Sequence, residues 1–226
     1  MAKHNEQQDN TQASGPAATR NWNLLAGWDW ANLLSKQPQF TEHCDWNKLG
    51  GWDWANLLSK QPQFAEHCRW GKLDGSDWAD LLSEQPQFAE PCRWKKLDGS
   101  DWVDLLSAQP QFSVHCDWNK LSGGDWANLL LKQPQFAEHC DWKKLDPWDW
   151  VNLLSEQPQF AEHCNWNKLK QLSSDDWAYL LSVHPEIQKF MDKSSALDFL
   201  ESIDGVKYLE NAFLSQYPPV GKKKKS

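Results

Sequence analysis

The 226-residue chain has no uncharged apolar run approaching the roughly 20 residues needed to span a bilayer. Its first 20 residues lack the apolar stretch of a secretory signal peptide. Catalytic and nucleotide-binding signatures are missing too: no G-x-S-x-G, P-loop, dinucleotide fingerprint or H-E-x-x-H occurs. We therefore expect a soluble, cytoplasmic, non-enzymatic protein with no cofactor.

Glycine and proline are too few, at 11 and 12 residues, for a collagen-like or low-complexity chain. Hydrophobic residues make up 40% and charged residues 24%, so a disordered chain does not fit either. Tryptophan is abundant instead, with 17 residues, several times what average usage supplies. An excess of that size calls for a structural cause.

The cause is an internal repeat of 24 residues. Its unit reads D-W-x-x-L-L-x-x-Q-P-Q-F-x-x-x-C-x-W-x-K-L, followed by a three-residue connector such as 74–76. The Trp of each D-W pair recurs at this interval at Trp30, Trp54, Trp78, Trp102, Trp126 and Trp150. The Trp of each C-x-W triplet recurs at the same interval at Trp46, Trp70, Trp94, Trp118, Trp142 and Trp166, and Trp22 lies one interval before the first of them.

The ends of the array differ from its middle, as expected where a terminal repeat lacks one neighbour. We expect six full copies over 29–172, preceded by a half-repeat cap at 21–28 and followed by a degenerate seventh copy at 173–194. Residues 195–220 are predicted to form a helical C-terminal cap. The polar segment 1–20 and the Lys-rich segment 221–226 are expected to be disordered tails.

Each repeat predicts short helices. In the segment 77–82 the large apolar side chains fall at i, i+3 and i+4, on one face of a helix, and Ser76 or Asp77 can cap its start. Pro86 ends this helix near Gln85 and begins a second one, Pro86 to Cys92. A third short turn is expected at 117–121. Helices this short are unstable alone, so the predicted fold is all-α, an α-solenoid of stacked repeats.

A β-hairpin array is the alternative, but the repeat has neither alternation nor β-branched residues. On its D-W-x-x-L-L-x-x-Q-P-Q-F and C-x-W-x-K-L segments, the stretch from about 22 to 191 resembles tandem arrays in uncharacterised bacterial repeat proteins. The resemblance implies a helical repeat array and implies no activity.

All six cysteines occupy one position of the repeat, which argues against a disulfide framework. Adjacent copies lie about one helix spacing apart, beyond the roughly 7 Å limit for Cα atoms of a disulfide. We expect a structural ladder of reduced, buried thiols packed as small apolar side chains at Cys44, Cys68, Cys92, Cys116, Cys140 and Cys164.

A histidine precedes most of these cysteines and raises the question of a metal site. Adjacent residues on a helix point about 100° apart, so a buried Cys leaves its His at the surface or edge. Pro91 takes the His position in the third copy. The pattern favours surface histidines over zinc ligands, and no metal site is predicted.

The residue before each D-W pair varies between copies, which argues against a core role for it. It is Trp28, Trp52 and Trp148 in three copies, but Ser76, Ser100 and Gly124 in others. Exposed aromatic residues often mark recognition surfaces, so these three tryptophans form the candidate binding surface. The alternative is that they pack on the preceding connector as hydrophobic staples.

Charge limits the partners. Residues 29–172 carry 14 Lys or Arg against 21 Asp or Glu, a net of −7, so the repeats lack the basic footprint of nucleic-acid binding. Only the segment 222–225, with four lysines, could make a weak contact with RNA. We expect a non-enzymatic repeat scaffold that binds a protein or peptide along an extended solenoid face. The alternatives are carbohydrate or cell-surface ligand binding through exposed Trp and a purely structural spacer.

Overall fold

The computed structural model describes residues 21–190, which form helices and turns and contain no strand. This part of the chain divides into two compact units, the first ending at Leu73 (unit 1) and the second beginning at Asp74 (unit 2). Both units are α-solenoids of short helices. The expected tails at 1–20 and 221–226 and the expected cap at 195–220 lie outside the described residues.

Every repeat contributes one ten-residue α-helix. In unit 1 these are α1 (Gly27–Lys36) and α2 (Gly51–Lys60). In unit 2 they are α3 (Gly75–Glu84), α4 (Gly99–Ala108), α5 (Gly123–Lys132), α6 (Pro147–Glu156) and α7 (Ser174–Val183).

The connections between the α-helices are 3-10 helices. Unit 1 contains η2 (Trp22–Leu24), η3 (Pro38–His43), η4 (Trp46–Lys48), η5 (Pro62–His67) and η6 (Trp70–Lys72). Unit 2 contains η7 (Pro86–Ala89), η8 (Trp94–Lys96), η9 (Pro110–His115), η10 (Trp118–Lys120), η11 (Pro134–His139), η12 (Pro158–His163), η13 (Trp166–Gln171) and η14 (Pro185–Phe190).

The N-terminus of each α-helix lies two to three residues before the cap expected from the sequence. The N-cap of α3 is Asp74, whose carboxylate accepts from the backbone N–H of Asp77 at 3.0 Å. Asp77 is the third helical residue, and its carboxylate accepts from the backbone N–H of Asp74 at 2.9 Å. The repeated Asp of the D-W pair is therefore the acidic half of a capping box, which satisfies two backbone donors at once.

The segment after each proline is a 3-10 helix, whereas the sequence suggested a second regular helix to Cys92. In η5 the backbone N–H of Cys68 donates to the carbonyl of Ala65, three residues back, at 3.0 Å. The six-residue length is too short for an α-helix with useful i to i−4 bonding. In the third copy Pro91 replaces His, and η7 ends earlier, at Ala89.

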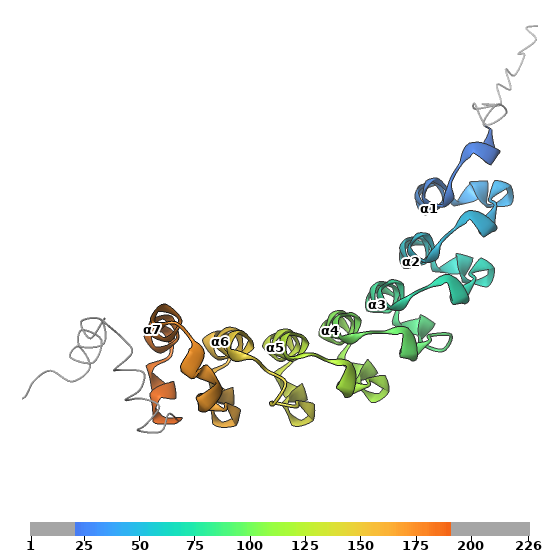
Figure 1. Cartoon of the computed structure of the whole chain (residues 1–226). Coiled ribbons are helices and arrows are strands. Elements are labelled where there is room, and N and C mark those ends of the chain that lie inside the picture. The colour runs from blue at the N-terminus through green and yellow to red at the C-terminus, as the bar shows by residue number, and fades with distance from the viewer. Residues whose placement is uncertain (1–20, 191–226) are drawn as a thin grey trace, which may run out of the picture. The chain divides into compact units, whose positions relative to one another are not determined.

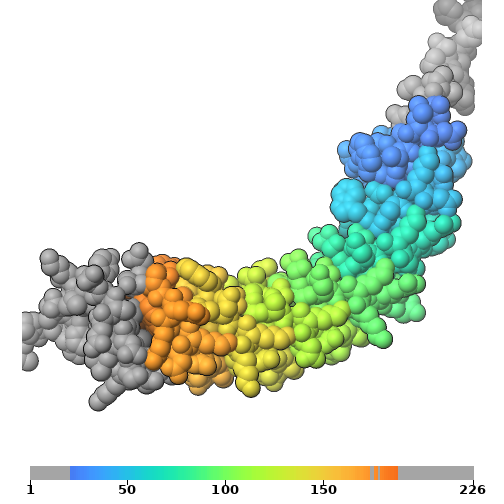
Figure 2. Space-filling model, in the orientation of Figure 1, coloured from blue at the N-terminus to red at the C-terminus, as the bar shows by residue number. Residues whose placement is uncertain are grey.

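The two kinds of helix form two layers within each unit. In unit 2 the α-helices from α3 to α7 lie side by side in one row, and the 3-10 helices form the other row (Figure 1). Successive repeats of a unit form a continuous surface in the space-filling view (Figure 2). The core lies between the layers and contains the Trp of each D-W pair, the adjacent Leu residues and the last Leu of each repeat.

An aromatic stack joins consecutive repeats within a unit. Trp118, at the end of one repeat, lies against Trp126 of α5, with ring centroids 5.4 Å apart and planes 19° apart. Trp118 also stacks on the imidazole of His139, with ring centroids 4.6 Å apart, and Phe136 packs against it at an angle. The same four-ring cluster recurs around Trp22, Trp46, Trp94 and Trp142.

Five of the buried tryptophans do not use their indole N–H as a hydrogen-bond donor within the described residues. The Nε1 atoms of Trp30, Trp54, Trp102, Trp126 and Trp150 have no hydrogen-bond partner within residues 21–190. Leaving a buried donor unpaired costs roughly 1–3 kcal/mol, so the apolar area and the ring contacts must outweigh that cost.

Within each unit, two side-chain ladders also link a repeat to the one before it. The Gln61 side-chain amide donates to the carbonyl of Ser35 in the last turn of α1 at 2.9 Å. The Lys144 ammonium donates to the carbonyls of Asn119 and Leu121 at 2.8 and 2.6 Å. Carbonyls at helix ends lack intrahelical hydrogen-bond donors, and the Gln and Lys side chains of both ladders donate to them. The ammonium of this repeated lysine therefore binds the preceding repeat.

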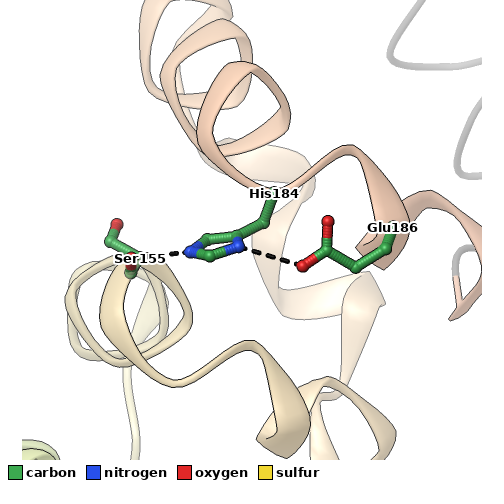
Figure 3. Close-up of polar contacts among 3 residues, drawn as sticks. All are labelled: Ser155, His184 and Glu186. Carbon is green, nitrogen blue, oxygen red and sulfur yellow. Dashed lines mark hydrogen bonds and ion pairs between the residues drawn. The ribbon is translucent and has the colours of Figure 1, made fainter.

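The seventh repeat keeps the first ladder with a different residue. His184 stands where the other repeats have Gln, after the insertion that lengthens η13. Its Nε2 lies 2.8 Å from the carbonyl oxygen of Ser155 in α6, and its Nδ1 lies 3.0 Å from the carboxylate of Glu186 (Figure 3). A neutral imidazole can donate to one of these two acceptors, whereas an imidazolium can donate to both.

A glycine at the start of an α-helix allows the next repeat to approach. A Cβ on Gly123 would overlap the carbonyl of Lys144, at the end of the same repeat, and the carboxylate of Asp149 in α6 of the following repeat. Gly27, Gly75 and Gly99 have the same surroundings. The neighbouring residue Gly124 has room, since a Cβ there would lie 3.5 Å from Asp149.

We predict that Gly123→Ala destabilises the array by about 1–3 kcal/mol, because overpacking forces the repeats apart. Gly124→Ala in the same helix is the control and should be neutral or stabilising by up to about 1 kcal/mol, as Ala is the better helix former. Urea unfolding followed by circular dichroism measures both. Equal effects of the two substitutions would contradict the close approach at Gly123.

We predict that His184→Gln leaves the thermal stability of the protein almost unchanged, because Gln makes this contact in the other repeats. His184→Ala should cost about 1 kcal/mol, as the Ser155 carbonyl loses its donor. Differential scanning calorimetry compares the two. A Gln variant as unstable as the Ala variant would show that the Ser155 contact does not stabilise the seventh repeat.

Candidate binding surface

The α-helix layer exposes one stripe of side chains per repeat. The stripe consists of the second, sixth and tenth helical residues, which lie on one face because they are four apart. In α1 these are Trp28, Asn32 and Lys36. The corresponding trios in the other helices are Trp52, Asn56, Lys60; Ser76, Asp80, Glu84; Ser100, Asp104, Ala108; Gly124, Asn128, Lys132; and Trp148, Asn152, Glu156.

Three tryptophans at the first position of the stripe are exposed. Trp28, Trp52 and Trp148 have 58%, 57% and 59% of their surface accessible, while the tryptophan two residues later in each helix is fully buried. Trp28 and Trp52 lie on α1 and α2, which pack against each other in unit 1. Trp148 lies on α6 in unit 2.

Sequence reasoning picked out these tryptophans but missed the rest of the stripe. The middle position is Asn or Asp in the six full copies and Tyr179 in the seventh, and the last position changes charge between copies. Spacing of four from each exposed tryptophan was the signal that could have found them. Every exposed tryptophan is followed four residues later by Asn, whereas Ser76 and Ser100 are followed by Asp.

The charge of the stripe differs sharply between α2 and α3. Exposed Lys36 and Lys60 are its only charged residues in unit 1, whereas the exposed Asp80, Glu84 and Asp104 make it acidic on α3 and α4. No ion pair within residues 21–190 involves these three carboxylates. Partial burial raises the pKa of Asp80, and the carboxylates of Asp104 and Asp74 raise it further.

The histidines of the 3-10 layer stack on the tryptophans of the preceding repeat. His67 stacks on Trp46 with centroids 4.4 Å apart, and its Nε2 lies 3.5 Å from the Glu66 carboxylate. Its side chain is 34% exposed, and His43, His115, His139 and His163 are exposed, so these histidines lie at the surface or edge as expected. Within residues 21–190 no three His, Cys, Asp or Glu side chains are grouped so as to hold a metal ion.

The six cysteines are free thiols in the described structure, and Cys164 is buried. The other five are only partly buried, which corrects the expectation of a buried ladder at these positions. In η5 the cysteine, Cys68, follows the end of the 3-10 helix in extended conformation and so lies outside the helix. Burial raises the pKa of Cys164. It also raises the pKa to about 12 at Cys44, Cys68, Cys92, Cys116 and Cys140.

Comparison of the chain with protein-family models, with curated proteins and with solved structures finds no match. None of the helices in the described part of the chain has the length and apolar character of a membrane span. The described residues form an all-helical, tryptophan-rich tandem repeat array. The exposed stripes of its α-helices are the candidate binding surface.

We predict that iodoacetamide labels the native thiols slowly at pH 8, because a pKa of about 12 reduces the reactive thiolate. The native rate should be roughly a thousandfold below that of an ordinary thiol with a pKa near 8.5–9. Labelling should still accelerate about tenfold per pH unit above pH 9, where an ordinary thiol levels off.

Mass spectrometry of the alkylated protein counts the modified thiols over time. All six should react at the ordinary rate after denaturation, which serves as the control. Native labelling at the rate of a free cysteine would show that the surroundings of these thiols do not suppress the thiolate.

Proposed function

We propose that this protein is a non-enzymatic repeat scaffold that binds a protein or peptide through the exposed stripes of its α-helix layer. Repeat arrays present extended surfaces of this kind, on which each repeat adds a few contacts. Each repeat offers the same groups again, which suits repeated contacts along an extended ligand and differs from the constellation of unlike groups that catalysis requires.

One observation carries the proposal: Trp28, Trp52 and Trp148 are more than half exposed at a position where other repeats have Ser or Gly. The smaller residues show that stacking of the repeats does not need an indole there. Exposing a large apolar ring to water brings the folded chain little stability, whereas Trp is enriched among residues that dominate binding energies.

The remaining conserved features of the repeat are used internally. The capping Asp, the Gln and Lys ladders, the His–Trp stack and the buried Leu residues all bind within or between repeats. A ligand would therefore meet the stripe residues without competing with the contacts that hold the array together.

Carbohydrate binding is the second candidate, favoured by the pairing of each exposed Trp with an Asn one helical turn away. An indole face can stack on a sugar ring while an amide bonds its hydroxyls. Asn152 is exposed beside Trp148, and Asn32 and Asn56 are half-buried. This pairing is absent from α3 and α4, where Ser precedes Asp.

We predict that replacing Trp28, Trp52 and Trp148 by Ser abolishes retention of the partner and leaves the fold intact, since Ser occupies this position in α3 and α4. The measurement is an affinity pull-down from native lysate with mass-spectrometric identification, compared with the unchanged protein. A glycan array with the same two proteins tests the carbohydrate candidate.

Val114→Glu is the matched control. Val114 is 82% exposed in the 3-10 layer, and four of the five other full copies have Glu followed by His at this point. This variant also removes an exposed apolar side chain, but from the opposite layer, so it should retain the partner. Partners that bind the Trp variant as well as the unchanged protein would refute the assignment of the binding surface.

A further inference from the structure

Two neighbouring pairs of repeats expose stripes with opposite properties. The basic face comprises Trp28, Asn32 and Lys36 of α1 with Trp52, Asn56 and Lys60 of α2. The acidic face comprises Ser76, Asp80 and Glu84 of α3 with Ser100, Asp104 and Ala108 of α4. Each face lies within one unit, and both are built from the same three helical positions.

We propose that the basic face of one copy of this chain binds the acidic face of a second copy. The proposal rests on the proposed function, since it identifies a partner for the same exposed stripes. A second copy is the partner because the two faces are complementary in charge and in side-chain size.

Charge is the first complementarity. Lys36 and Lys60 give the basic face two positive charges, and Asp80, Glu84 and Asp104 give the acidic face three negative charges. No lysine or arginine within residues 21–190 pairs with these carboxylates. Asp80 and Asp104 repel each other across α3 and α4, and an ammonium group from another chain would relieve that repulsion.

Size and register provide the second. The basic face has its large side chains, Trp28 and Trp52, in the column where the acidic face has Ser76 and Ser100. The hydroxyls of these serines donate to the N-cap carboxylates of Asp74 and Asp98, at 3.0 and 2.9 Å. The side chains at this position therefore project little from the helix surface. An indole ring can therefore lie over the start of α3 or α4.

The repeat geometry makes the columns coincide. The three positions of a stripe span about 12 Å along the helix, at 1.5 Å per residue. Neighbouring helices lie roughly 8–10 Å apart in both faces, because the stacking residues are the same. When the facing helices run in the same direction, Trp meets Ser, Asn meets Asp, and Lys meets Glu84 or Ala108. Asp80 and Asp104 then lie one helical turn, about 6 Å, from the facing lysine position, within reach of the long lysine side chain.

The test uses the full chain and analytical ultracentrifugation over a range of protein concentrations. We expect concentration-dependent association that weakens at least tenfold between about 50 and 500 mM salt, because exposed ion pairs are screened. Two variants, K36E/K60E and D80K/D104K, should each weaken association at least tenfold. A 1:1 mixture of the two should restore it, since each variant then meets a complementary face in the other.

Neutral variants guard against loss of folding. D80N and D104N introduce the residue that four other full copies have at this position, and K36A introduces the Ala of the fourth copy. Circular dichroism confirms their folding, and each should weaken association in the same direction by a smaller factor. A variant ending before Gly221 removes Lys222–Lys225 and should associate like the full chain.

Several results would overturn the proposal: a protein that stays monomeric at all concentrations, charge reversals without effect, or a mixture that fails to associate. Association that depends on Lys222–Lys225 would assign the acidic face to the C-terminal tail instead. A monomeric protein that still retains a foreign partner through Trp28, Trp52 and Trp148 would refute self-recognition and leave the scaffold function standing.

Discussion

Stacking between consecutive repeats is the interaction on which the rest of this structure depends. Ten-residue helices and 3-10 turns of three to six residues are too short to persist in water by themselves. These short helices are held in place because Trp118 and its equivalents stack on a buried indole and on an imidazole of the following repeat. The Gln and Lys side chains then bind carbonyls at the ends of the preceding helices, so backbone groups that one repeat leaves unpaired are paired by the next.

This dependence divides the residues of a repeat into two groups. Residues that stack or donate between repeats vary little, because a change in one repeat misplaces its neighbour. The glycine that admits Asp149 against α5 is the clearest example. The stripe residues (the second, sixth and tenth of each helix) make their side-chain hydrogen bonds within their own repeat, as Ser76 and Ser100 do, so these residues can differ between copies. That freedom is what allows Trp52 and Ser76 to occupy equivalent positions and lets two pairs of repeats differ in charge on a common framework.

The 3-10 layer follows from the same constraint. Proline ends each α-helix, and the few residues before the next aromatic anchor leave room for tight turns only. These turns place the histidine on the tryptophan and leave most cysteines half-buried. Burial raises the pKa of the half-buried Cys68 thiol to about 12, which lowers the fraction of thiolate at neutral pH. A side chain can thus be accessible in part and nevertheless have few thiolate ions.

The 24-residue period, the helical class, the end of each α-helix before Gln-Pro and the exposure of Trp28, Trp52 and Trp148 follow from the sequence, because they depend on local spacing and on comparison between copies. The roles of Lys144 and Gln61 do not, because these side chains bind carbonyls of the preceding repeat that only stacking brings close. The cap at Asp74 and the 3-10 hydrogen bonds are local, three residues apart, but several capping residues and two helix types compete for the same short segment. Local periodicity predicts which face of a helix is apolar. The residues that contact that face are determined only when the neighbouring repeat packs against it.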